Sequence, residues 1–238
     1  MKLPFESGLR RRIFLLRHAE AAYGTSNGPE DSRLVSLTTL GREQASGMAD
    51  LLVDTNIDRA VCSGLPRTRE TAEIVIGARE LTLEEVPELE EIRPIAPSSR
   101  KLDGIRRELA YTLWDAKKPD GSFLGGERFA DLWGRVIPAL ERLLADDWSS
   151  MLLVCHGVVN RVILSWALGA ELSSLPNMEQ DSCCLNVIDI DVSDETGEMI
   201  RRIVRVLNLT PYDLPKANQV LTTLERQAQQ LQNARRRS

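Results

Sequence analysis

The chain contains two histidines, and each follows a short apolar run. His18 comes after Ile13-Phe14-Leu15-Leu16-Arg17, and His156 comes after Met151-Leu152-Leu153-Val154-Cys155. Apolar runs of this length that stop at small or polar residues are typical of buried strands. Ligands of open α/β sheets bind beyond the carboxyl ends of the strands, so both histidines are candidate functional residues. The structural alternative is that each imidazole only caps its strand through a backbone hydrogen bond.

Two arginines lie at comparable positions and point to an anionic ligand. Arg17 directly precedes His18, and Arg67 follows a short apolar run that ends at Ser63. A guanidinium group offers a positive charge and a fork of donors that matches phosphate oxygens. The sequence therefore predicts a phosphate site at these strand ends. The alternative is that both arginines are surface residues paired with acids.

The acidic pair Glu90-Glu91 follows a third short apolar run, over 81–86. This pair would lie at the same edge of the sheet as the predicted phosphate site, so both residues are further candidates for a chemical role. The alternative without a function is that Glu91 is a solvated charge in the acidic run from Glu84 to Glu91.

The elements that must position these residues alternate between strands and helices. Pro66 is well placed in the first turn of a helix, and Pro138 inside a long apolar stripe predicts a kink or two shorter helices. Such alternation predicts an α/β fold of three layers, α/β/α, with a mostly parallel sheet and an antiparallel edge. We expect strands over 13–16, 58–62, 81–86, 151–155, 185–190 and 199–207, and helices over about 38–53, from 66, within 102–113, from 129 to 144, and after 157.

The domain organisation follows from where this pattern is interrupted. We expect a single catalytic domain over residues 1–210, with a helical insertion at about 92–128, where proline and glycine break the pattern. We expect residues 211–238 to form a C-terminal helical extension. Its weak apolar stripe could pack on the body of the domain or on a second subunit, so a homodimer is one option.

Composition excludes several classes of protein. The net charge of −5 argues against general nucleic-acid binding, and no apolar run approaches the length that spans a membrane. Residues 1–9 lack the apolar core of a signal peptide, so we expect a cytoplasmic protein with reduced thiols. The spacing of Cys62, Cys155, Cys183 and Cys184 matches none of the usual zinc patterns, and we expect no metal and no cofactor.

Five segments together resemble the histidine phosphatase superfamily, the phosphoglycerate mutase-like proteins. They occur in the order of that family and span roughly residues 13 to 165. They are Leu15-Leu16-Arg17-His18-Ala19-Glu20, the stretch from Leu37 to Ala45, the stretch from Ser63 to Ala72, Gly125-Gly126-Glu127, and Cys155-His156-Gly157. Single motifs of this length are weak, but five in order are strong evidence.

The resemblance implies the family's fold and a role for each matching residue. His18 would take the phosphoryl group as phosphohistidine, while Arg17, Arg67 and His156 would hold the phosphate oxygens, with His156 also counted among the catalytic residues. The segment around Glu90 and Glu91 is similar to the one that carries the general acid, and its register favours Glu91. The implied activity is a metal-independent phosphatase for a small phosphomonoester.

Departures from the family pattern leave alternatives open. Gly24 stands where mutases and some phosphatases place a phosphate-contacting Asn, so Ser26 or Asn27 would have to substitute. The residues after Glu91 lack the glycines usual downstream of the acid, which argues against an orthodox mutase. A phosphoglycerate-type mutase and a non-catalytic phosphate-binding regulator are the two rival hypotheses.

Overall fold

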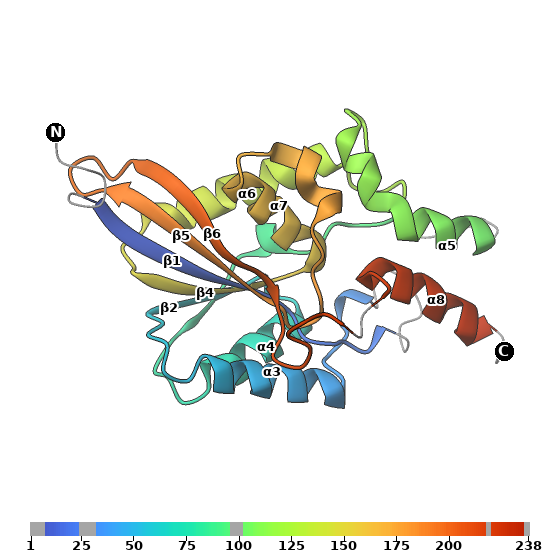
Figure 1. The fold of residues 1–238 in the computed structure, drawn as a ribbon, viewed down its shortest axis with the longest axis horizontal. Helices are drawn as coiled ribbons and strands as arrows, with labels where there is room; N and C mark the ends of the chain where they lie inside the picture. Colours follow the sequence, from blue (N-terminus) through green and yellow to red (C-terminus); the bar gives the residue numbers. More distant parts are fainter. Residues whose placement is uncertain (1–7, 24–31, 96–101, 218–219, 236–238) are drawn as a thin grey trace.

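A mixed sheet of six strands lies between two layers of helices (Figure 1). The computed structural model describes residues 8–23, 32–95, 102–217 and 220–235. The sheet order is β3-β2-β4-β1-β5-β6; the first three pairs are parallel and the last two antiparallel, as the sequence predicts. The strands are β1 (Gly8–Arg17), β2 (Arg59–Cys62), β3 (Leu83–Glu85), β4 (Ser150–Cys155), β5 (Leu185–Ser193) and β6 (Met199–Leu209).

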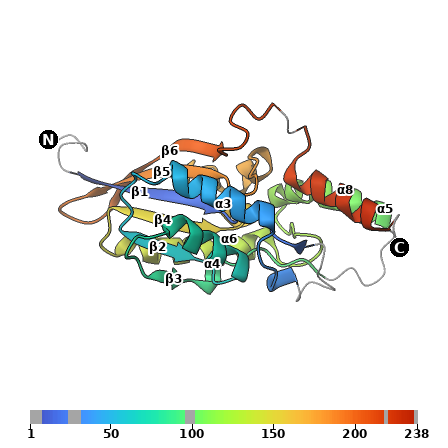
Figure 2. The same cartoon turned by 90° about the horizontal axis from the view of Figure 1, so that it is seen from below.

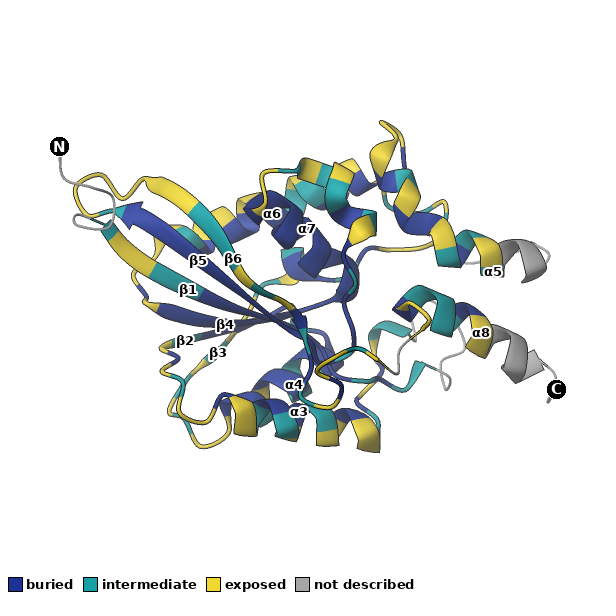
Figure 3. Cartoon of the chain, in the orientation of Figure 1, coloured by how far each residue is buried: buried dark blue, intermediate teal, exposed yellow. Residues whose placement is uncertain are grey.

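Alternate side chains of the central strands face opposite helical layers. Ile13 and Leu15 of β1 belong to the core beneath α6 (Phe129–Ala145) and α7 (Gly157–Ala167). Phe14 and Leu16 belong to the core beneath α3 (Thr39–Leu51) and α4 (Pro66–Ile76). The strands at the centre of the sheet and the whole of α7 are buried, while the outer faces of α3 and α6 are exposed (Figure 3). This three-layer arrangement confirms the predicted fold class.

Local sequence signals explain where the helices begin. Thr38 caps α3 by accepting the N–H of Gly41, and Pro66 is the first residue of α4. In contrast, α6 runs without a break through Pro138, so the expected alternative of two shorter helices is wrong. The residues on either side, Ile137 and Ala139, are both buried, and that burial outweighs the backbone hydrogen bond lost at proline.

Residues 87–128 contribute no strand to the sheet in the parts that the structure describes. They form the short helix η2 (Pro87–Leu89), α5 (Leu102–Tyr111) and η3 (Thr112–Lys117). The last helix, α8 (Thr223–Arg235), lies alongside α5 (Figure 2), and Arg106 donates a hydrogen bond to the carbonyl of Ala228. The C-terminal helix therefore packs on the body of the chain. The division into a domain of 1–210, an insertion and an extension stays a prediction.

No helix in the described ranges is both long and apolar enough to cross a membrane.

Candidate active site

The register of the two central strands brings the histidines together. Arg17 of β1 pairs with Cys155 of β4, and the backbone N–H of His18 donates to the carbonyl of Cys155. The next residue of each strand is a histidine, and the two rings lie 5.3 Å apart between centroids. Both side chains are buried, with 2% and 0% of their surface exposed. The structure thus places His18 and His156 in one site, as the sequence predicts.

The hydrogen bonds of His18 define which ring nitrogen is reactive. Nδ1 lies 2.7 Å from the carbonyl oxygen of Ala19. Because a carbonyl can only accept, Nδ1 carries the proton and Nε2 keeps its lone pair. Burial, together with the charges of Arg67 and Arg17, holds the pKa of His18 well below its ordinary value. The ring is therefore neutral, as a nucleophile must be, and the hydroxyl of Tyr23 lies 3.3 Å from Nε2.

A chain of hydroxyl groups orients His156. Thr68 Oγ1 donates to the carbonyl of Leu65 at 2.8 Å, which leaves the Ser63 hydroxyl to donate to Thr68. Ser63 Oγ then accepts from Nε2 of His156 at 2.7 Å. Burial first, and then neighbouring positive charge, lower the pKa of His156 well below its ordinary value. Its Nδ1 is buried and has no hydrogen-bond partner in the described part of the chain.

Both predicted arginines are buried beside the histidines. Arg17 and Arg67 are only 6% and 3% exposed, so the alternative of paired surface arginines is wrong. Arg17 Nη1 donates to the carbonyl of Gln180 at 2.6 Å, and Arg67 Nη1 lies 3.2 Å from the carbonyl of Arg33. Nε of each guanidinium is buried and, among the described residues, lacks a hydrogen-bond partner. These two donors are held inside the protein and are available to an anion.

The two candidate acids point to different partners. Glu91 Oε2 accepts the N–H of Val158 at 3.2 Å, in the first turn of α7, two residues after His156. Glu90 instead accepts from Arg33 at 2.6 Å and from Arg93 at 3.2 Å. The structure therefore places Glu91, rather than Glu90, at the helix terminus beside the site. With each oxygen accepting a backbone N–H, Glu91 is not a freely solvated charge.

Arg135 and Glu127 fix the segment that carries Glu91. Glu127 pairs with Arg135 at 2.7 Å and accepts the N–H of Arg93 at 3.1 Å. Arg135 also donates to the carbonyl of Glu90 at 2.8 Å. A Cβ on Gly126 would lie 2.1 Å from the carbonyl oxygen of Arg93, so this glycine permits the close approach. The Gly-Gly-Glu motif thus has a structural role in holding the acidic segment in place.

Comparison with known proteins accounts for this arrangement. The model of the histidine phosphatase superfamily (branch 1) matches residues 13–202. The chain belongs to this superfamily. All the motifs of the predicted site lie inside the matched region.

Named relatives in the superfamily include phosphatases and mutases. The 2-carboxy-D-arabinitol-1-phosphatase of Triticum aestivum is 28% identical over 182 residues, which are 75% of this chain and 37% of that protein. This chain thus spans less than half the length of that plant relative. "Probable phosphoglycerate mutase GpmB" of Erwinia tasmaniensis is 27% identical over 183 residues, which are 75% of this chain and 84% of that protein. The crystal structure of the alpha-ribazole phosphatase from Shigella flexneri superposes with a TM-score of 0.65 at 26% identity. The match covers 83% of this chain and 96% of that structure.

Several contacts of this superfamily member were not predicted from its sequence. The hydroxyl of Tyr23 lies close to Nε2 of His18. Arg17 contacts the carbonyl of Gln180 and the hydroxyl of Thr223, which belongs to α8. Tyr23 could have been noticed as an aromatic residue in the loop after His18. The contact between Gln180 and Arg17 could have been suspected from the polar run Glu179-Gln180-Asp181, which precedes β5. Gly24, Ser26 and Asn27, considered above as phosphate contacts, lie outside the described residues.

The four cysteines are buried free thiols. Burial raises the pKa of Cys184 to about 12 and that of Cys183 further, so both stay protonated. Within the described ranges no three His, Cys, Asp or Glu side chains are grouped in a way that could hold a metal ion.

Proposed function

We propose that the chain is a phosphatase that hydrolyses a small phosphomonoester through a phosphohistidine at His18, without a metal ion. One observation carries the proposal. In the described residues, three side-chain nitrogens are buried without hydrogen-bond partners: Nε of Arg17, Nε of Arg67 and Nδ1 of His156. Buried polar groups are normally satisfied, and an anion at His18 would accept from Nε of both arginines. Nδ1 of His156 carries no proton, so it would be satisfied by a protonated oxygen of that anion.

In the first step, Nε2 of His18 attacks phosphorus and the bond from phosphorus to the leaving oxygen breaks. Glu91 gives a proton to that oxygen, so the product leaves as an alcohol. Arg17 and Arg67 stabilise the charge on the transferring group, which is the main contribution of a protein to phosphoryl transfer. His156 contributes a further hydrogen bond once its Nδ1 is protonated or meets a protonated phosphate oxygen.

In the second step, Glu91 takes a proton from water and the resulting hydroxide attacks phosphorus. The bond between phosphorus and Nε2 breaks, which releases inorganic phosphate and restores neutral His18. The lowered pKa of His18 favours this return to the neutral ring.

The test is to incubate the metal-free protein with a panel of ³²P-labelled metabolite phosphates and to quench in alkaline denaturant, in which the phosphorus–nitrogen bond survives. We expect release of phosphate and a labelled, acid-sensitive protein, with both lost in His18→Ala. Label that persists on His18→Ala would exclude this nucleophile. Phosphate release that needs added metal would exclude the metal-independent reaction.

A phosphomutase is the second candidate because the mutase-named relative matches over 84% of its own length. In that reaction the phosphoryl group of His18 returns to a substrate hydroxyl instead of to water. Isomerised phosphoglycerate that depends on a bisphosphate primer, with little free phosphate, would favour the mutase. We expect instead that free phosphate is the main product and that little isomerised phosphoglycerate forms.

A further inference from the structure

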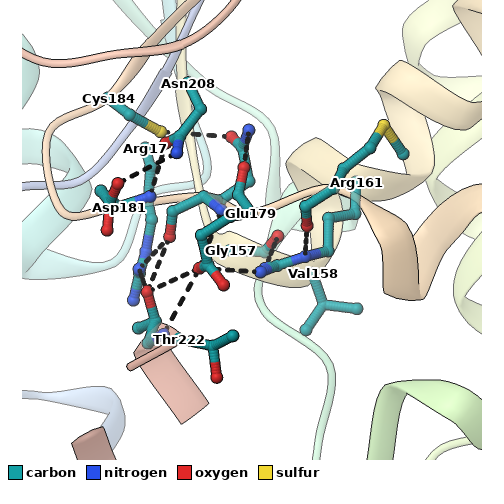
Figure 4. Close-up of polar contacts among 12 residues, drawn as sticks. Arg17, Gly157, Val158, Arg161, Glu179, Asp181, Cys184, Asn208 and Thr222 are labelled. Carbon is teal, nitrogen blue, oxygen red and sulfur yellow. Dashed lines mark hydrogen bonds and ion pairs between the residues drawn. The ribbon is translucent and has the colours of Figure 1, made fainter. Parts of the chain in front are cut away.

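The segment that follows η4 (Glu171–Asn177) contacts the catalytic core and the C-terminal helix at the same time. Glu179 lies between Arg17 and Arg161 (Figure 4). Its Oε1 accepts from Arg161 Nη2 at 3.1 Å and from Thr223 Oγ1 at 2.8 Å. The carbonyl of the next residue, Gln180, accepts from Arg17 Nη1 at 2.6 Å. A single short segment therefore connects α7, α8 and the predicted phosphate-binding arginine.

Helix α8 is fixed at this place by its first turn. Thr222 and Glu225 form a reciprocal capping box, with the N–H of Thr222 donating to Glu225 at 2.8 Å and the N–H of Glu225 donating to Thr222 at 3.3 Å. The carboxylate of Glu179 lies at this helix N-terminus, where negative charge is favourable. Arg226, one turn further on, pairs with Asp181 at 2.9 Å.

Thr223 is the residue of α8 that reaches Arg17. Its side chain is buried, and Oγ1 lies 3.4 Å from Arg17 Nη1 and 3.0 Å from the carbonyl oxygen of Gln180. Nη1 is thereby occupied by two oxygens. The guanidinium of Arg17 lies against Gly157, because a Cβ on that glycine would be 3.4 Å from Nε and 3.5 Å from Cζ. Gly157 directly follows His156, so the unpartnered Nε lies close to the strand end that carries this histidine.

Charge gives Glu179 a second role in this arrangement. Arg17 and Arg161 are both buried, and Arg161 is only 3% exposed. Two guanidinium groups on either side of one carboxylate repel each other less than two guanidinium groups alone. Loss of Glu179 would leave Arg161 without its ion pair and would push Arg17 away from its present position.

We infer that Thr223 and Glu179 are positioning residues for Arg17, so that α8 completes the phosphate site. The inference rests on the proposed function, since it assigns Arg17 to phosphate. Neither residue touches the reacting atoms. They hold Nη1 of Arg17 so that Nε is presented to the anion.

The test compares Thr223→Val with Thr222→Val, using the affinity for inorganic phosphate as the readout, measured by calorimetry and, where the protein is active, as an inhibition constant. Valine at 223 keeps the shape but removes the hydroxyl, and we expect the inhibition constant of phosphate and KM to rise about tenfold, as for a lost hydrogen bond to a charged group. Thr222→Val weakens the cap of the same helix without touching Arg17. We expect it to leave phosphate affinity within about twofold of the wild type.

A double-variant experiment shows whether the effect passes through Arg17. In Arg17→Met, which keeps the length but has no donor, Thr223→Val should weaken phosphate binding by less than about twofold, measured calorimetrically. An unchanged phosphate constant in Thr223→Val would overturn the inference. So would an equal loss in Thr222→Val, or an undiminished effect of Thr223→Val in the Arg17→Met background. Far-UV circular dichroism checks that each variant is folded.

The inference and the proposed function can fail separately. If the wild type binds phosphate but releases none from any ester, the phosphatase proposal fails, while the Thr223 comparison still stands. If the wild type hydrolyses esters and Thr223→Val matches it, only the positioning role fails.

Discussion

The two histidines have opposite hydrogen-bonding arrangements although they occupy equivalent strand ends. His18 carries its proton on Nδ1, towards Ala19, and His156 carries its proton on Nε2, towards Ser63. The open nitrogen is therefore Nε2 in the first and Nδ1 in the second. This difference suits His18 to attack phosphorus, whereas Nδ1 of His156 contacts a phosphate oxygen favourably only when a proton lies between the two atoms.

Tyr23 should contribute to phosphoryl transfer. Burial raises the pKa of its phenol, so the hydroxyl stays a donor, and once Nε2 bears phosphorus a phosphoryl oxygen is its natural acceptor. We expect Tyr23→Phe to slow phosphorylation of His18 about tenfold or more, from the worth of a hydrogen bond to a charged group. Single-turnover kinetics measures this rate. The matched control is Tyr111→Phe, at an exposed tyrosine; equal rates in the two variants would contradict the role of Tyr23.

The two adjacent glutamates should differ in their effect on hydrolysis. Glu91→Gln removes the proton donor and base, and we expect kcat to fall about 10²-fold or more. Glu90→Gln only loosens the contacts to Arg33 and Arg93, so a much smaller loss is expected. Steady-state assays on the best substrate compare the two. A greater loss in Glu90→Gln would transfer the acid role to that residue.

The convergence of the arginines, the histidines and Glu91 could be predicted because each lies in a short contiguous motif at the end of a strand or a few residues after it. Tyr23, Glu179 and Thr223 could not. Arg17 is separated from Gln180 by 163 residues and from Thr223 by 206 residues along the chain. Contacts over such distances depend on how loops and helices are placed, and periodicity does not specify that placement.

At the scale of elements, helix α3 supports the loop that follows His18. The N–H of Thr38, at the start of the helix, donates to the carbonyl of Glu20, and Thr38 Oγ1 donates to the carboxylate of Glu20. Gly41 lies against the same carbonyl, since a Cβ there would come within 2.1 Å of its oxygen. The absence of a side chain at Gly41 thus lets α3 approach the loop directly after His18.

Two glycines of α3 should therefore respond oppositely to alanine. Gly41→Ala forces the helix away from Glu20, and we expect it to lower the free energy of unfolding by about 1–3 kcal/mol. Gly47→Ala meets no atom closer than 3.7 Å, and helix propensity should make it stabilising by about 0.5–1 kcal/mol. Urea denaturation measures both. A neutral Gly41→Ala would contradict the close packing of α3 on the loop.

The elements were predicted well where apolar periodicity and turn residues agree. The hairpin of β5 and β6 and the start of α4 at Pro66 are examples. The expected division of α6 at Pro138 is wrong because the rule for proline is local, while α6 is stabilised by the core on both sides of it.

For the whole molecule, the buried histidines make stability depend on pH. The pKa values of His18 and His156 are lowered in the folded state, whereas in the unfolded chain each is about 6.5. As the pH falls below about 6.5, the unfolded state binds protons that the folded state does not, so the free energy of unfolding falls. The slope approaches about 2.7 kcal/mol per pH unit for two histidines.

Urea unfolding between about pH 5 and 8 measures this slope, with His18→Asn/His156→Asn as the control. The buried aspartates whose pKa is lowered, such as Asp191 at about 2, lose their contribution only in stronger acid and do not interfere. The slope should vanish in the double variant. A wild-type protein equally stable at both ends of the range would show that the histidines are not held neutral.

The pairing of β1 with later strands has a consequence for synthesis on the ribosome. Thr223, which contacts Arg17, lies 206 residues further along the chain. At usual rates of elongation, its synthesis follows that of Arg17 by about 10–40 s. For most of that interval β1 has emerged but β4 and β5 have not, so its apolar side chains lack their partners in the sheet. The segment that bears the proposed nucleophile thus needs protection from aggregation while the chain is being synthesised.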